Sequence, residues 1–129
     1  FDKLGVEYPY TSVVVLRQTA AKSPDLVERF IKCIVEGIHI FKTDKSKSLA
    51  ALRLYMKGAD EGILEESYQH TRGTIDDAPY PSLQVVKAGL EMLSLQYPQA
   101  KQTDASLIIG PAFMKRIDDS GFVRALYKK

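Results

Sequence analysis

The residues whose side chains could perform chemistry are few and scattered along the chain. His39 and His70 have no second histidine, cysteine or carboxylate at a metal-ligand spacing such as H-E-x-x-H, which favours a structural or surface role for both. Acidic residues occur as the adjacent pairs Glu65-Glu66, Asp76-Asp77 and Asp118-Asp119. Because neighbouring residues on a helix point in different directions, these pairs are typical of helix caps and solvated faces rather than of a catalytic dyad.

Motifs of the common reaction classes are absent from the sequence. There is no G-x-S-x-G, phosphate-binding glycine loop, dinucleotide fingerprint or paired C-x-x-C. Cys33 is the single cysteine, which excludes an intramolecular disulfide, and its apolar-rich surroundings predict a small buried side chain rather than a reactive thiol. We therefore expect no enzymatic activity, no metal and no cofactor.

Thr11 and Ser12 are the polar residues with the best position for binding a ligand. They precede Val13 to Leu16, a continuously apolar and largely β-branched run that predicts a short strand buried on both faces. Open α/β folds place ligand-binding groups at the ends of such strands. The alternative is that both hydroxyls only bond to their own backbone where the strand begins.

Helices are predicted for nearly all of the chain after this strand. Ser23, Pro24 and Asp25 form a helix start, and apolar residues then recur at helical spacing as far as Phe41. Asp60 and Ser82 are further caps, Gly58 is a stop, and Leu107-Ile108-Ile109 is a short apolar anchor. The predicted helices run from Pro24 to Thr43, Ser46 to Lys57, Glu61 to Thr71 and Leu83 to Gln96, followed by a pair from Pro111 to Tyr127 that breaks at Ser120-Gly121.

Composition limits the class of protein. With 129 residues, 45% of them hydrophobic and 26% charged, a single globular domain is expected. A formal net charge of +2, with cationic residues spread among carboxylates, argues against a nucleic-acid partner. No apolar run reaches the length of a membrane span. Because the sequence begins with Phe1 rather than Met, we expect a fragment or a processed product.

Three segments give the chain a family resemblance. They are Glu36-Gly37-Ile38-His39-Ile40-Phe41-Lys42-Thr43, Ala78-Pro79-Tyr80-Pro81-Ser82 and Asp118-Asp119-Ser120-Gly121-Phe122-Val123. Together with the apolar strand and the Ser-Pro-Asp helix start, they resemble the carboxy-terminal part of the substrate-binding proteins of nitrate/sulfonate/taurine-type ABC importers. The resemblance extends along nearly the whole chain.

The resemblance implies an α/β fold of the periplasmic binding protein type II class. Residues 1–129 would be one carboxy-terminal portion of a two-lobed protein, mainly α, with five to six helices and one or two short strands at the amino-terminal end. The stretch from Tyr8 to Ser12 would lie near the segment that crosses between the lobes, so Tyr10, Thr11 and Ser12 are the expected ligand-binding residues.

The implied function is extracytoplasmic solute binding. The protein would capture a small anionic or zwitterionic ligand, of the nitrate, sulfonate, taurine or thiamine-precursor type, in the periplasm and deliver it to an ABC permease in the membrane. The isolated piece could also pair with a second copy of itself, because a severed lobe exposes apolar surface. The alternative is a self-sufficient helical protein-interaction module without a small-molecule ligand, which the near absence of strands after Leu16 favours.

Overall fold

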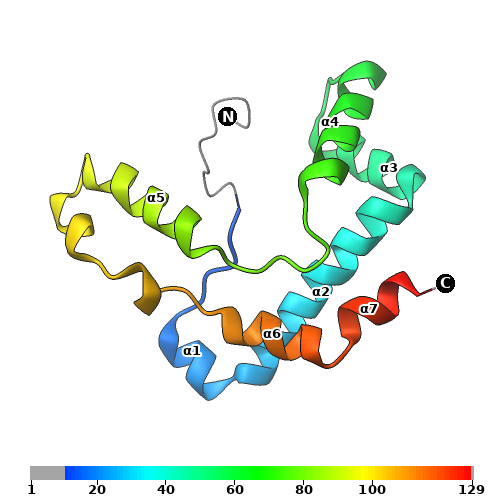
Figure 1. Ribbon diagram of the computed structural model, residues 1–129. Coiled ribbons are helices and arrows are strands. Elements are labelled where there is room, and N and C mark those ends of the chain that lie inside the picture. The colour runs from blue at the N-terminus through cyan, green and yellow to red at the C-terminus, as the bar shows by residue number, and fades with distance from the viewer. Residues whose placement is uncertain (1–10, 129) are drawn as a thin grey trace.

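The computed structural model describes residues 11–128 and is mainly helical (Figure 1). The mainly helical prediction is confirmed. The helices are α1 (Arg17–Lys22), α2 (Pro24–Thr43), α3 (Lys45–Tyr55), α4 (Glu61–Thr74), α5 (Leu83–Ser94), the 3₁₀ turns η2 (Pro98–Gln102) and η3 (Ala105–Leu107), α6 (Pro111–Asp119) and α7 (Phe122–Tyr127).

The long helix α2 is the element on which the others are arranged. Helices α6 and α7 pack along it, and α3 and α4 pack against each other beyond its carboxyl end. Helix α5 lies on the other side of the molecule in Figure 1, where η2 and η3 pack on it. The α3–α4 pair and the α5 unit therefore form two separate arms on the α2–α6–α7 base.

The core lies between α2, α6 and α7. Val35, Met114, Ile117 and Val123 form a buried cluster, with Ile117 only 1% exposed. Around it pack the partly buried Ile31, Ala78, Phe122, Leu126 and Tyr127. The predicted apolar stripe of α2 thus supplies one wall of the core, and helices some 80 residues later in the sequence supply the other.

Local end signals of the helices fold largely as predicted. Asp60 and Ser82 cap α4 and α5 by accepting hydrogen bonds from the backbone N–H groups of Ile63 and Val85. Gly58 and Gly121 have φ angles of 86° and 77°, a left-handed conformation that favours glycine and ends a helix. Ser23 was expected to cap α2 in the same way, but its side chain makes no capping hydrogen bond.

The predicted strand at Val13 to Leu16 is wrong. Residues 11–16 belong to no strand or helix, and no strand occurs in residues 11–128. Val14 is 85% and Leu16 75% exposed, so the run is not buried on either face. A strand needs a neighbour that accepts and donates its ladder hydrogen bonds, and the described part of the chain offers none. Instead the Leu16 carbonyl accepts from the Ala20 N–H, and α1 begins at Arg17.

Two other burial predictions are also wrong. Cys33 is exposed, because α6 and α7 cover a different face of α2. Leu107 and Ile108 are exposed rather than an apolar anchor. Residues 98–107 contain the turns η2 and η3. Among the described residues, no helix is long and apolar enough to cross a membrane.

The core makes a direct prediction about stability. Changing Ile117→Ala leaves a cavity between α2 and α6, so the free energy of unfolding should fall by about 2–4 kcal/mol. Urea denaturation followed by circular dichroism measures the loss. The matched change Ile108→Ala, at an exposed isoleucine, should cost less than about 0.5 kcal/mol. Equal losses in the two variants would contradict the assigned core.

Candidate functional site

The predicted ligand-binding residues do not form a site within the described structure. Tyr10 lies outside the described residues. Thr11 and Ser12 are exposed in the extended segment before α1, and the strand that was to place them at a sheet edge is not formed. No strand end therefore positions Thr11 and Ser12, although both residues are exposed to solvent.

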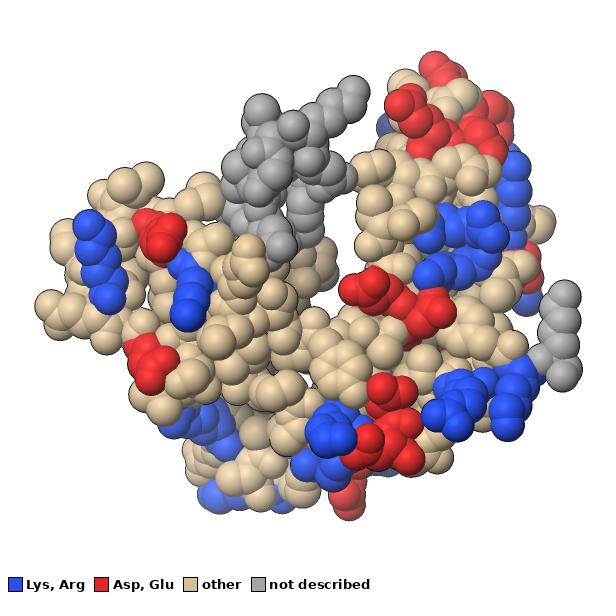
Figure 2. Space-filling view, viewed as in Figure 1, with Lys and Arg blue, Asp and Glu red and all other residues tan. Residues whose placement is uncertain are grey.

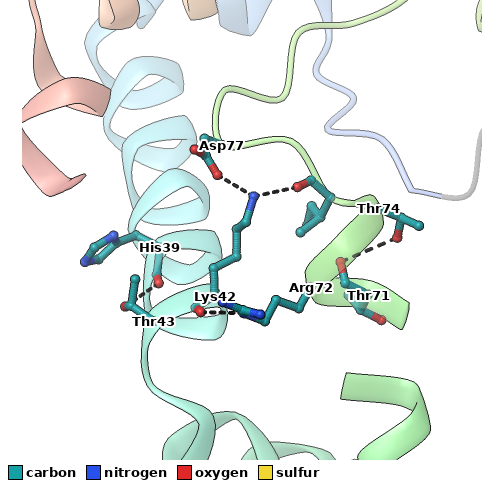
Figure 3. A network of polar contacts seen from close by, with 8 residues as sticks. His39, Lys42, Thr43, Thr71, Arg72, Thr74 and Asp77 are labelled. Atoms are coloured by element: carbon teal, nitrogen blue, oxygen red, sulfur yellow. Dashed lines mark hydrogen bonds and ion pairs between the residues drawn. The ribbon is translucent and has the colours of Figure 1, made fainter. Parts of the chain in front are cut away.

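A polar network lies instead at the carboxyl end of α2, as Figure 3 shows. The Lys42 ammonium donates to the Ile75 carbonyl at 3.0 Å and to Oδ1 of Asp77 at 2.5 Å. In return, Nε of Arg72 donates to the Lys42 carbonyl at 3.0 Å. Lys42 therefore ties α2 to the end of α4 and to the segment that follows it.

The helices place these groups for simple electrostatic and geometric reasons. Lys42 lies in the last turn of α2, where a cation stabilises the negative end of the helix dipole. The Asp44 side chain then caps α3, and α4 packs back along α3, which brings Arg72 beside Lys42. Two ion pairs, Lys45–Glu65 at 2.8 Å and Arg53–Glu61 at 2.7 Å, join α3 to α4.

His39 and Tyr127 form a second, more buried pair next to this network. Their rings meet edge to face, with centroids 4.7 Å apart and planes at 88°. Nδ1 of His39 and Oη of Tyr127 are both buried; Nδ1 has no hydrogen-bond partner among residues 11–128, and Oη lies close to the Asp77 carboxylate. Burial raises the pKa of Tyr127 to about 12, and the interaction of its hydroxyl with the ionised Asp77 adds to the rise.

The ionisation states of Asp77 and Tyr127 fit a structural network rather than a catalytic one. The hydrogen bond from Lys42 lowers the pKa of Asp77, so this carboxylate is ionised at neutral pH and already paired. Tyr127 is protonated under the same conditions. The described residues contain no group of three or more histidine, cysteine, aspartate or glutamate side chains that could hold a metal ion. The contacts of Lys42 and His39 fix the relative positions of α2, α7 and the segment after α4.

Two of the three segments that carry the family resemblance contact each other near this network, and the remaining one begins directly after Val35 of the buried core cluster. Tyr80 Oη donates to Oδ2 of Asp118 at 3.0 Å, which joins the second segment to the third. Ala78 packs on the buried cluster that contains Val35, next to the first segment. We call the meeting place of residues 36–43, 78–82 and 118–123 the motif junction. Sequence reasoning found the segments but gave no sign that they come together.

A hollow of about 470 Å³ lies away from the motif junction, between α5 and the turns η2 and η3. Lys87, Glu91, Lys101 and Asp104 belong to its lining. Two hydrogen bonds from Ser106 lower the pKa of Asp104. Sequence reasoning missed this hollow. On the face seen in Figure 2, basic side chains lie beside acidic ones.

Comparisons with known proteins give no relative for the chain: no family model, no curated protein and no solved structure matches it.

The Lys42–Asp77 pair makes a prediction about pH. The pKa of Asp77 is lower in the folded than in the unfolded chain. The ion pair therefore adds fully to the free energy of unfolding above the unfolded pKa, about 4. This contribution is lost as the pH falls through the folded pKa. At pH 7, Asp77→Asn should lower the free energy of unfolding by about 0.5–1 kcal/mol, the range for a partly exposed pair. As the pH falls below about 4, the stability gap between the variant and the unchanged protein should narrow.

Urea titrations at several pH values measure this difference, with Asp76→Asn at the exposed neighbouring residue as the control. If the difference in free energy of unfolding between Asp77→Asn and the unchanged protein stays constant from pH 7 to pH 2.5, it does not come from the ionised Lys42–Asp77 pair.

Proposed function

We propose that this chain is the carboxy-terminal portion of an extracytoplasmic solute-binding protein of an ABC importer. The whole protein would have the two-lobed α/β architecture of periplasmic binding protein type II, and the ligand would be a small anion or zwitterion of the nitrate, sulfonate, taurine or thiamine-precursor type. Its partners would be that ligand and a membrane permease, and its place of action the periplasm or its equivalent.

The observation that carries the proposal is the motif junction. The segments at residues 36–43, 78–82 and 118–123 are far apart in the sequence, yet Tyr80 bonds Asp118, and Ala78 packs on the buried cluster that contains Val123 of the third segment and Val35, the residue before the first. Segments that fold into one unit are constrained together, which supports reading them as parts of one family pattern rather than as separate chance resemblances.

The exposed segment before α1 supports the same proposal. Val13, Val14, Val15 and Leu16 place four apolar side chains in solvent, and a run of this kind is stable only when something covers it. In a two-lobed protein the other lobe would cover this run. Thr11 and Ser12, which directly precede the run, would then lie near the boundary between the lobes, where their hydroxyls could donate to an anionic ligand.

The mechanism would be capture and release without chemistry on the ligand. A ligand that contacts both lobes stabilises the closed state, and the permease would recognise that state. The ionised, paired Asp77 and the protonated Tyr127 fit a structural part in such a cycle.

A helical protein-interaction module remains the second candidate. It is favoured by the lack of any strand in residues 11–128 and by the exposed apolar side chains on α5, which include Leu83, Met92 and Leu93. Such a module would use these side chains to bind another protein and would have no small-molecule ligand.

The mass of the intact precursor in the source cells separates the two candidates. Mass spectrometry should find a chain that contains this sequence and is long enough for two lobes of about 100–150 residues each. A precursor no longer than 129 residues would contradict the proposal and favour the interaction module.

Ligand binding by that precursor gives a second prediction. Isothermal titration with nitrate, taurine and short alkanesulfonates should find a binding ligand, and Thr11→Ala with Ser12→Ala should weaken its binding by about tenfold or more, because hydrogen bonds to a charged ligand are lost. Ser46→Ala, at an exposed serine of α3, is the matched control and should change nothing. Unchanged affinity in the Thr11/Ser12 variant would remove these residues from the site.

A further inference from the structure

Helix α2 has a second apolar face that the described helices leave about half exposed. Val27, Val35 and Ile38 are buried on one side, but Leu26 and Phe30 are 53% and 52% exposed on the other. The exposed face consists of Leu26, Phe30, Cys33, Gly37 and Ile40, which we call the α2 stripe. A helix that is apolar around so much of its circumference is normally buried on both sides.

The spacing of the α2 stripe is that of a coiled-coil seam. Its residues follow one another at intervals of four, three, four and three. The two core positions of a coiled-coil heptad, a and d, alternate at the same intervals. No charged residue interrupts it. Arg29 and Glu36 lie seven residues apart along one edge of the stripe, at the flanking position where coiled coils place the charges that choose the partner.

These edge charges favour an antiparallel partner with the same sequence. In an antiparallel pair, Arg29 of one copy lies opposite Glu36 of the other. The two-fold axis also places Glu36 of the first copy opposite Arg29 of the second, so the dimer has two such contacts. In a parallel pair the same charges would face Ile34 and Phe41 and gain nothing. Both Arg29 and Glu36 are exposed, and neither has an ion-pair partner within residues 11–128.

The sizes of the side chains fit the same register. Aligning Arg29 with Glu36 of the second copy places Leu26 opposite Gly37 and Phe30 opposite Cys33, so each layer sets a large side chain against a small one. A Cβ added at Gly37 would meet nothing within 4 Å. Beside it, α2 and α3 enclose a hollow of about 240 Å³ lined by Gly37, Ile40, Phe41, Lys47, Ser48 and Ala51, which could receive Leu26.

We propose that the α2 stripe is a self-complementary docking surface for a second copy of this chain, which pairs antiparallel to it about a two-fold axis between Phe30 and Cys33. The proposal goes beyond the proposed function, because it concerns the chain itself and does not need a solute. The opposite charges of Arg29 and Glu36 set the direction of pairing, and the small residues Cys33 and Gly37 allow close approach of the helices.

A charge-exchange experiment tests the pairing directly. Sedimentation equilibrium should find a dimer of the 129-residue chain. Arg29→Glu and Glu36→Arg each replace two attractive contacts by two repulsive ones, so each should weaken the dimer by about tenfold. The double variant restores opposite charges and should recover the dissociation constant to within about threefold. Lys57→Glu makes the same charge change as Arg29→Glu at an exposed residue away from the stripe, and should have no effect.

Cross-linking of the single cysteine adds an independent readout. A short bismaleimide should join Cys33 of one copy to Cys33 of the other, because both lie near the two-fold axis, and Phe30→Glu should abolish the product while the helical circular dichroism signal stays unchanged. A chain that stays monomeric at all concentrations would overturn the proposal. So would a double variant that dimerises as poorly as the single ones, since the association would then not depend on the Arg29–Glu36 pairing.

Discussion

The interaction on which the rest of the structure depends is the packing of α6 and α7 against the middle of α2. Val35 is fully buried there, and Met114 and Ile117 of α6 close over it. Burial of apolar surface is the dominant stabilising contribution in a chain of this size, and this cluster joins α2 to helices far along the sequence. The remaining elements are attached to this base: α3 and α4 through the carboxyl end of α2, and the segment before α5 through Ala78 and Tyr80.

Polar contacts around the apolar core orient the helices that the core holds together. At one end of the α2–α6 interface, Arg116 donates to Glu28 at 2.5 Å, and toward the other end Lys42 holds Asp77 and the Ile75 carbonyl. The hydrogen bond between Tyr80 and Asp118 lies between the same elements. These contacts are partly exposed and contribute little stability one by one, but their directional geometry fixes how the helices are oriented. The contacts at and beside the motif junction therefore fix the orientation of α2, α6 and the segment before α5.

Features that depend on neighbouring residues could be predicted from the sequence, whereas features that depend on contacts between distant residues could not. Helix starts at Pro24, Asp60 and Ser82 and the break at Gly121 depend on residues within one turn, and these predictions are confirmed. The strand at Val13 to Leu16 needed a partner that local sequence cannot supply, and it is absent. Cys33 was placed in the core because α2 is apolar on both sides, while only contact with α6 and α7 decides which side is buried. The Lys42–Asp77 pair joins residues 35 positions apart, a separation at which no sequence pattern gives a signal.

Hydrogen exchange of the backbone amides, resolved by residue with NMR, tests the central claim that α2, α6 and α7 form the cooperative base of the fold. The amides around Val35 and Ile117 should exchange most slowly and together, at the rate of global unfolding. Those of α5 should exchange faster, because α5 packs mainly on η2 and η3, and residues 13–16 should exchange almost as fast as an unfolded chain. Slow exchange at residues 13–16, or protection in α5 equal to that around Val35, would contradict this account of how the chain is held together.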